Sequence, residues 1–176
     1  RIQKLKAGSV GGSAQHTNRQ RYTPNADPEK QHIRIIGEPD TPKTPDLETL
    51  VRQRIGYQTI RKNAVLAVEF LLTASPEYFR PDDPGRAGYY SPQRLEDFQH
   101  TACEWLTNNY GDRIVRAELH LDEATPHIHA YLVPLDEKGK LNCRALFGGS
   151  RYRLSELQDS FAKAMVPLGL ERGIKG

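Results

Sequence analysis

The chain has 176 residues, 37% of them hydrophobic and 27% charged, a composition that suits one globular domain with a polar surface. No apolar run approaches the length that spans a bilayer and no signal peptide is visible, so the sequence predicts a cytoplasmic domain without membrane contact. The two cysteines, Cys103 and Cys143, supply neither a disulfide framework nor a CxxC motif.

The formal net charge is +3, but the charge is unevenly distributed. Residues 1–62 hold 12 basic and 6 acidic residues, whereas residues 63–176 hold 13 basic and 16 acidic residues. A basic amino-terminal third predicts contact with a polyanion on one side of the molecule. An ordinary solvated surface explains the charge equally well, so charge alone does not indicate nucleic acid.

The amino-terminal segment combines a strand pattern with small and polar residues. Residues 1–6 alternate as in a strand, and residues 7–12 are small enough to let the backbone approach a ligand or another strand closely. Residues 13–22 carry a histidine, hydroxyls, amides and two arginines without apolar periodicity, so we expect a loop that contacts phosphates. From this segment alone, His16 would be an ordinary surface histidine.

The next third of the chain predicts one helix and one buried strand. A short strand is expected at residues 33–36, and a helix that ends near residue 55 is expected to begin with Thr44 as N-cap and Pro45 as its first residue. Residues 64–73 are apolar on both faces, which predicts a central strand of a sheet. Glu69 interrupts this run and is therefore either paired or functional.

The remaining elements complete an α+β pattern. One helical turn is expected at residues 76–79, followed by a helix that begins after Ser91 as N-cap, runs to Tyr110 and ends with Gly111 as its cap. A short strand is expected at residues 141–144, and a last helix over residues 154–166. The order predicts an α+β domain in which helices pack against one face of a central antiparallel sheet.

The stretch from His120 to His129 holds three histidines and two carboxylates in ten residues. Strand-like flanks predict that it is the tip of a hairpin. His127 and His129 leave the same face of a strand, and His120 should lie opposite or diagonal to His127. Imidazoles with an optional carboxylate suit Mn, Zn, Fe, Co or Ni, and with open positions also Mg. A third histidine, the carboxylates and a stiffening proline disfavour the alternative of a polar loop with chance histidines.

Several segments resemble the Pre/Mob family of plasmid mobilisation relaxases, the MobV type of HUH endonucleases. The similar segments are residues 4–12, His16, residues 60–65, residues 120–129 and residues 169–173. The resemblance covers nearly the whole chain, and its most specific part is residues 120–129. It implies an HUH fold, a central antiparallel sheet with helices, and a relaxase catalytic domain over residues 1–176 that is expected to be truncated at both ends.

The resemblance also implies an activity. Such relaxases nick one strand of single-stranded or hairpin origin-of-transfer DNA by transesterification and form a covalent 5′-phosphoryl–protein intermediate. A divalent ion is implied, Mn²⁺ first and Mg²⁺ as the alternative, without a small-molecule cofactor. The oligomeric state stays open.

The resemblance assigns roles to individual residues. His120, His127 and His129 are the implied metal ligands, and Glu123 is either a further ligand or a base that orients a neighbouring group. His16 matches the nucleophile of the MobV branch. The fallback nucleophiles are Tyr22, then Tyr89 and Tyr90. The candidates for phosphate contacts are Arg19, Arg21, Arg61 and Lys62.

Two other functions stay open at this point. A metal-dependent phosphodiester hydrolase would use the same histidines and Glu123 with water as nucleophile, and would leave no covalent adduct. A DNA-binding module without enzymatic activity would hold structural histidines, bind hairpin DNA in the presence of chelators and cleave nothing.

Overall fold

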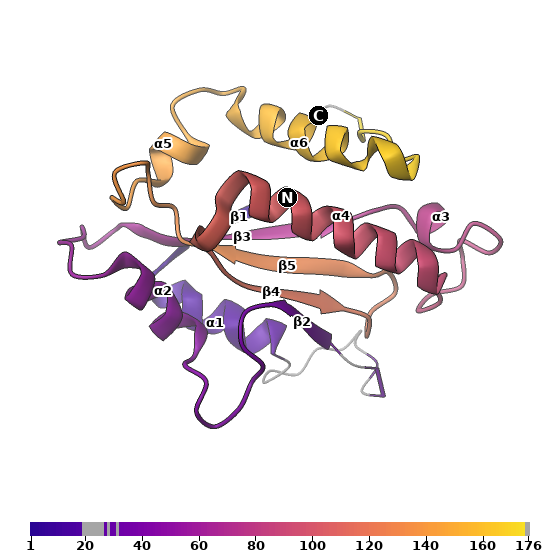
Figure 1. The fold of residues 1–176 in the computed structure, drawn as a ribbon, viewed down its shortest axis with the longest axis horizontal. Coiled ribbons are helices and arrows are strands. Elements are labelled where there is room, and N and C mark those ends of the chain that lie inside the picture. The colour runs from indigo at the N-terminus through magenta and orange to yellow at the C-terminus, as the bar shows by residue number, and fades with distance from the viewer. Residues whose placement is uncertain (19–26, 28, 31, 175–176) are drawn as a thin grey trace.

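A computed structural model of the chain describes residues 1–18, 27, 29–30 and 32–174. Its centre is a five-stranded antiparallel sheet with the strand order β1-β3-β5-β4-β2 (Figure 1). The strands are β1 (Ile2–Lys6), β2 (His32–Ile36), β3 (Val65–Thr73), β4 (Ile114–His120) and β5 (His127–Leu132). The helices are α1 (Ala7–Thr17), α2 (Leu47–Ile55), α3 (Pro76–Phe79), α4 (Pro92–Tyr110), α5 (Cys143–Phe147) and α6 (Arg153–Met165). The predicted α+β class with an antiparallel sheet is confirmed.

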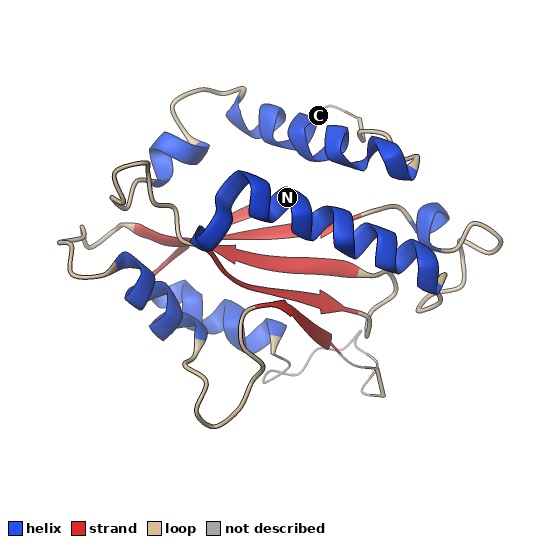
Figure 2. Ribbon diagram, in the orientation of Figure 1, coloured by secondary structure: helices blue, strands red, loops and turns tan. Residues whose placement is uncertain are grey.

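Helices cover both faces of the sheet, so the prediction that they pack on one face was wrong (Figures 1 and 2). On one face, Val10 of α1 and Val51 of α2 share a core with Tyr131 of β5. On the other face, Phe98 of α4 shares a core with Ile128 of β5. Successive residues of a strand point to opposite faces, and β5 has a large side chain at each of these positions. Each face therefore carries apolar side chains that a layer of helices must bury.

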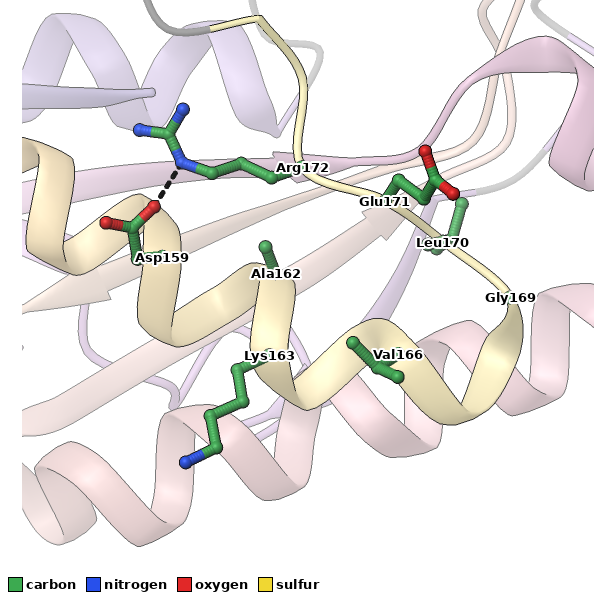
Figure 3. Close-up of a pocket in the computed structure, with 8 residues that line it drawn as sticks. All are labelled: Asp159, Ala162, Lys163, Val166, Gly169, Leu170, Glu171 and Arg172. Atoms are coloured by element: carbon green, nitrogen blue, oxygen red, sulfur yellow. Dashed lines mark ion pairs between the residues drawn. The ribbon is translucent and has the colours of Figure 1, made fainter.

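The α6 helix adds a further layer on α4. Trp105 donates a hydrogen bond from Nε1 to Ser160 Oγ at 3.0 Å, and its ring packs edge-on against Phe161 at 5.1 Å. A hollow of about 460 Å³ lies between α6 and residues 169–172, where Arg172 pairs with Asp159 (Figure 3). This hollow belongs to the helical layer on the far side of the sheet from α1. Within the described residues, no helix is both long and apolar enough to cross a bilayer.

Residues 7–17 form the helix α1, whereas the sequence predicted a loop. The segment has three glycines and no apolar period, so its intrinsic helix propensity is low. Val10 and Thr17 are nevertheless fully buried against the rest of the fold. Tertiary packing of one face therefore stabilises a helix that local sequence does not favour. His16 consequently lies in the last turn of a helix.

The α2 helix begins at Leu47, two residues later than predicted, and Asp46 rather than Thr44 is its N-cap. The Asp46 carboxylate accepts a hydrogen bond of 2.8 Å from the backbone N–H of Thr49. Thr44 instead donates its hydroxyl to the Pro39 carbonyl at 2.6 Å, which stabilises the preceding turn. Both residues are good caps by type, and only the backbone path distinguishes them.

The prediction of a strand at residues 141–144 was also wrong. Leu141 makes an isolated bridge to Leu135, and the chain then enters α5 with Asn142 as N-cap. Asn142 accepts a hydrogen bond of 3.1 Å from the Ala145 N–H, a role for which asparagine is well suited. The predicted α3, the Ser91 cap of α4 and the Gly111 cap at its end are confirmed.

The cap of α2 yields a stability prediction. Replacing Asp46 by alanine should lower the free energy of unfolding by about 1 kcal/mol, because the Thr49 N–H loses its acceptor. The same hydrogen bond holds the pKa of Asp46 below its ordinary value. This stabilisation is therefore present at neutral pH and is lost as the pH falls through the lowered pKa of the folded state. Urea unfolding at pH 7 and at low pH measures both effects.

Ser91→Ala is the matched control for this prediction. Ser91 Oγ lies 3.5 Å from the Arg94 N–H that it caps, a longer contact than that of Asp46. Ser91→Ala should lower the free energy of unfolding by less than Asp46→Ala does. Its effect should not depend on pH, since serine does not titrate in this range. Equal losses of unfolding free energy in the two variants at both pH values would contradict the assignment of Asp46 as the N-cap of α2.

Candidate metal centre

The alternation of side chains along β4 separates an apolar face from a polar face. Ala117 and Leu119 are fully buried in the core beneath α4. Arg116, Glu118 and His120 alternate with them along the strand and face the α1 side, and each is at most 2% exposed. Neighbouring strands add polar residues to the same face: His32, Arg34, Glu69, His127 and His129. The polar face of the sheet is thus the floor of the candidate site.

Three histidines of the β4–β5 hairpin converge on one point. His120 and His127 are register partners across the hairpin, as the sequence predicted. The ring centroids of His120, His127 and His129 lie 4.7–5.2 Å apart. One nitrogen of each ring lies within 4.8 Å of the others. Nitrogens that bind one ion at about 2.1 Å are about 3 to 4 Å apart, so small side-chain rotations would let this triad hold a metal ion.

Hydrogen bonds select the nitrogen that two of these rings present. His127 donates from Nδ1 to the Thr125 carbonyl at 3.0 Å, and His129 donates from Nδ1 to Glu69 Oε1 at 2.6 Å. A carbonyl and a carboxylate oxygen can only accept, so Nδ1 carries the hydrogen in both rings. The Nε2 atoms are then the lone-pair nitrogens that a metal ion requires.

Glu69 lies in the middle of the most hydrophobic strand and is the partner of His129. Burial would raise the pKa of the Glu69 carboxyl, but hydrogen bonds from His129 and Ser13 outweigh it and lower the pKa below its ordinary value. The carboxylate is therefore ionised at neutral pH. A carboxylate behind an imidazole orients the ring and makes it a stronger ligand, which fits the donor set of a metal centre.

Glu118 stands behind His120. Its Oε2 lies 3.6 Å from His120 Nε2. Its Oε1 accepts a hydrogen bond from Arg34 Nη2 at 2.6 Å and lies 3.6 Å from Arg116 Nε. Burial would raise the pKa of Glu118, but the contact with His120 and the charges of Arg116 and Arg34 bring it to about 2. A permanently anionic, fully buried carboxylate thus supports the second arm of the triad.

His16 lies beside the triad. Its ring centroid is 6.3 Å from that of His129 in an edge-on arrangement, and its side chain is exposed. Because α1 packs on the polar face of the sheet, its last turn brings His16 next to the histidine hairpin. The structure therefore brings His16 next to His120, His127 and His129, which lie more than 100 residues further along the sequence.

Glu123 lies in the turn between β4 and β5. Its Oε1 is 3.9 Å from Nε2 of His127, the lone-pair nitrogen of that ring. One oxygen of Glu123 also lies within 4.8 Å of ligand atoms of His120 and Asp122. Glu123 is thus close to the point on which the triad converges.

The remaining candidates lie elsewhere. Arg61 and Lys62 occupy an exposed turn before β3, whereas Thr73, at the opposite end of β3, pairs with His127. The length of the strand places the two basic residues roughly 25 Å from the triad. Arg19, Arg21 and Tyr22 lie outside the described residues.

Tyr89 and Tyr90, the other fallback nucleophiles, lie in the loop that precedes α4. Tyr89 is 48% exposed and lies under the Arg86 guanidinium at 4.6 Å, and Tyr90 packs against the α4 core.

The sequence did not single out His32 or Arg80. His32 is the register partner of His120, with ring centroids 5.8 Å apart. Arg80 is 4% exposed and donates to the Ala124 carbonyl at 2.9 Å and to Thr125 Oγ1 at 3.3 Å, which anchors the histidine hairpin from behind. An isolated histidine or arginine carries no signal in the sequence, because its partners come from distant segments.

Comparison with known proteins finds the same protein family over the whole chain. The family model described as plasmid recombination enzyme (Mob_Pre) matches residues 1–176. A "65 kDa protein" of Zymomonas mobilis is 34% identical over 100% of this chain and 30% of its own length. A plasmid recombination enzyme of Streptococcus agalactiae is 32% identical over 98% of this chain and 35% of its own length. The chain spans about a third of the length of these two curated relatives.

Several solved structures of one protein are similar to this chain in both fold and sequence. The MobM relaxase domain (MOBV; Mob_Pre) bound to plasmid pMV158 oriT DNA of 22 nucleotides, in an Mn-bound crystal structure at pH 5.5, matches with a TM-score of 0.80 and 30% identity. The match covers 98% of this chain and 88% of that one. The same domain with 23-nucleotide DNA matches with a TM-score of 0.77. The chain therefore belongs to the Mob_Pre family of plasmid recombination enzymes, the relaxase family that its motifs resemble.

Proposed function

We propose that this domain nicks one strand of origin-of-transfer DNA by transesterification and so forms the covalent protein–DNA intermediate of plasmid mobilisation. The observation that carries the proposal is the exposed His16 imidazole beside the His120, His127 and His129 triad. Membership in the plasmid recombination enzyme family supports it, as does the likeness to an Mn-bound relaxase domain in complex with oriT DNA.

The triad would hold a divalent ion, with Glu123 as a further ligand. The short distance from Glu123 to the lone-pair nitrogen of His127 favours this role over that of a base for His16. Mn²⁺ is the ion we propose, because a nitrogen-rich set suits it better than Mg²⁺, which prefers oxygen ligands. When bound, the ion would polarise a phosphate oxygen and stabilise charge that develops there.

His16 supplies the nucleophile. A neutral imidazole attacks the scissile phosphorus through its lone-pair nitrogen, and needs no deprotonation of a phenol with a pKa of about 10. As the N–P bond forms, the bond from phosphorus to the 3′ oxygen breaks. The electron pair leaves with that oxygen, which takes up a proton from water, and the 5′ phosphate stays on His16. The reverse reaction rejoins the ends.

The nucleophile can be tested directly. The domain is incubated with a single-stranded origin oligonucleotide and Mn²⁺, and products are separated on a denaturing gel with and without acid treatment. A phosphohistidine is acid-labile, so we expect an acid-labile adduct in the wild type and in Tyr22→Phe, and none in His16→Ala. An acid-stable adduct lost in Tyr22→Phe would move the nucleophile to tyrosine. Cleavage without an adduct in any protein would instead favour a hydrolase that uses water.

The metal centre yields a second prediction. Glu69→Gln keeps the shape of the side chain but removes the charge behind His129, so the Mn²⁺ affinity should fall by about 10- to 100-fold. Isothermal titration with Mn²⁺ and with Mg²⁺ measures this in the absence of DNA. Glu48→Gln, a partly exposed carboxylate that pairs with Arg52 on α2, is the matched control and should bind Mn²⁺ as the wild type does. Unchanged Mn²⁺ affinity in Glu69→Gln would exclude a role of Glu69 behind the ligand.

The DNA contacts yield a third prediction. We propose that Arg61 and Lys62 contact phosphates at a distance from the triad. Each such contact contributes about −0.7 to −0.9 to the slope of log affinity against log salt concentration. Arg61→Ala should therefore make that slope less negative by about the contribution of one contact. Fluorescence anisotropy over a series of salt concentrations measures it, with Arg52→Ala, paired to Glu48 on α2, as control. An unchanged slope in Arg61→Ala would remove Arg61 from the DNA contacts.

A further inference from the structure

Two hydroxyl residues of α1 face the polar side of the sheet and flank His16 in sequence. Ser13 and Thr17 are four residues apart, so they lie on the same side of the helix. Ser13 is partly buried and Thr17 is fully buried, whereas His16 on the same turn is exposed. The helix thus presents its nucleophile to solvent and its hydroxyls to the floor of the site.

Ser13 connects the helix to one metal-ligand candidate. Its Oγ donates a hydrogen bond of 2.6 Å to Glu69 Oε2, because a carboxylate oxygen can only accept. The other oxygen of Glu69 accepts from His129 Nδ1 at 2.6 Å. One buried carboxylate therefore holds the α1 helix with one oxygen and His129 with the other.

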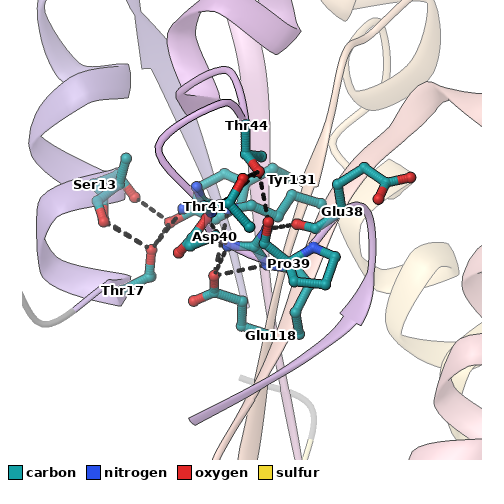
Figure 4. Close-up of polar contacts among 12 residues, drawn as sticks. Ser13, Thr17, Glu38, Pro39, Asp40, Thr41, Thr44, Glu118 and Tyr131 are labelled. Carbon is teal, nitrogen blue, oxygen red and sulfur yellow. Dashed lines mark hydrogen bonds and ion pairs between the residues drawn. The ribbon is translucent and has the colours of Figure 1, made fainter.

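Thr17 connects the helix to the other arm of the triad. Arg116 Nη2 donates to Thr17 Oγ1 at 3.1 Å, and the same guanidinium lies 3.6 Å from Glu118, which stands behind His120. The contacts of Ser13 and those of Thr17 meet at Tyr131, whose phenol oxygen lies 2.8 Å from Ser13 Oγ and 3.1 Å from Thr17 Oγ1 (Figure 4). The phenol donates its hydrogen to Thr17 Oγ1.

We propose that Ser13, assisted by Thr17, is a positioning residue that sets the distance between His16 and the metal centre. The proposal rests on the assignment of His16 as the nucleophile. The helix has three glycines and weak intrinsic propensity, so its orientation depends on such anchors. A displacement of about 1 Å between reacting groups can cost about 100-fold in rate, which makes the anchor relevant to chemistry rather than to folding alone.

The experiment compares Ser13→Ala with Ser9→Ala, which is the same change at an exposed position of the same helix. Adduct formation is measured in a single turnover at saturating Mn²⁺ and oligonucleotide. Ser13→Ala should form the adduct at least tenfold more slowly than Ser9→Ala, with dissociation constants for Mn²⁺ and DNA within about threefold of the wild type. Ser13→Thr, which keeps the hydroxyl, should restore most of the rate. His16→Ala in the same assay reports on the proposed function itself.

A second readout needs no activity. Bound Mn²⁺ broadens the NMR signal of the His16 imidazole to an extent that falls steeply with their separation. We expect Ser13→Ala to change this broadening and Ser9→Ala to leave it as in the wild type. Equal broadening and equal rates in the two alanine variants would overturn the proposal. A rate loss matched by losses of Mn²⁺ affinity and of the urea midpoint would overturn it as well, because it would indicate a purely structural role. Should the wild type form no adduct, the broadening still decides whether Ser13 positions His16.

Discussion

The register between β4 and β5 is the constraint on which the site depends. His120 pairs with His127, and Glu118 pairs with His129, so all four side chains leave the sheet on the α1 side. A shift of one residue would turn one strand's histidines into the core beneath α4 and break the triad. The register is held by the apolar residues of the opposite face, such as Leu119 and Ile128, which can be buried in only one way. The core beneath α4 therefore determines the geometry of the candidate metal centre.

The polar face is stable because its buried charges are paired. Glu118 is fully buried yet ionised, since Arg34 and Arg116 face it from β2 and β4. Removing one partner from such a group is costly, because a buried charge would be left uncompensated. The same carboxylate supports His120, so stability and ligand geometry use the same contacts. Glu69 plays the equivalent part for His129 and also holds α1 through Ser13. The proposed nucleophile and the proposed metal ligands are thus attached to one connected network.

Local patterns predicted the histidine hairpin and both ends of α4, although they misplaced the N-cap of α2. The spacing of His127 and His129, two apart on a strand, and the position of His120 at the end of the preceding strand predicted the hairpin and the shared face of the three rings. Ser91 and Gly111 marked the ends of α4 correctly, because capping depends on the side chain or backbone freedom at one position. The motifs of residues 120–129 also pointed to the family that the comparisons identified.

The sequence by itself determined the α+β class, the histidine hairpin and the family. Only the tertiary structure decided that residues 7–17 are a helix, that helices cover both faces of the sheet, and that Glu69, Glu118 and His32 lie against the histidines of the candidate site. A glycine-rich segment has no local preference for a helix, and Val10 and Thr17 favour one only when a sheet is present to bury them. Likewise, the role of Glu69 follows from partners 56 and 60 residues away, Ser13 and His129. Such long-range pairing is set by how strands and helices pack, which no short segment of sequence contains.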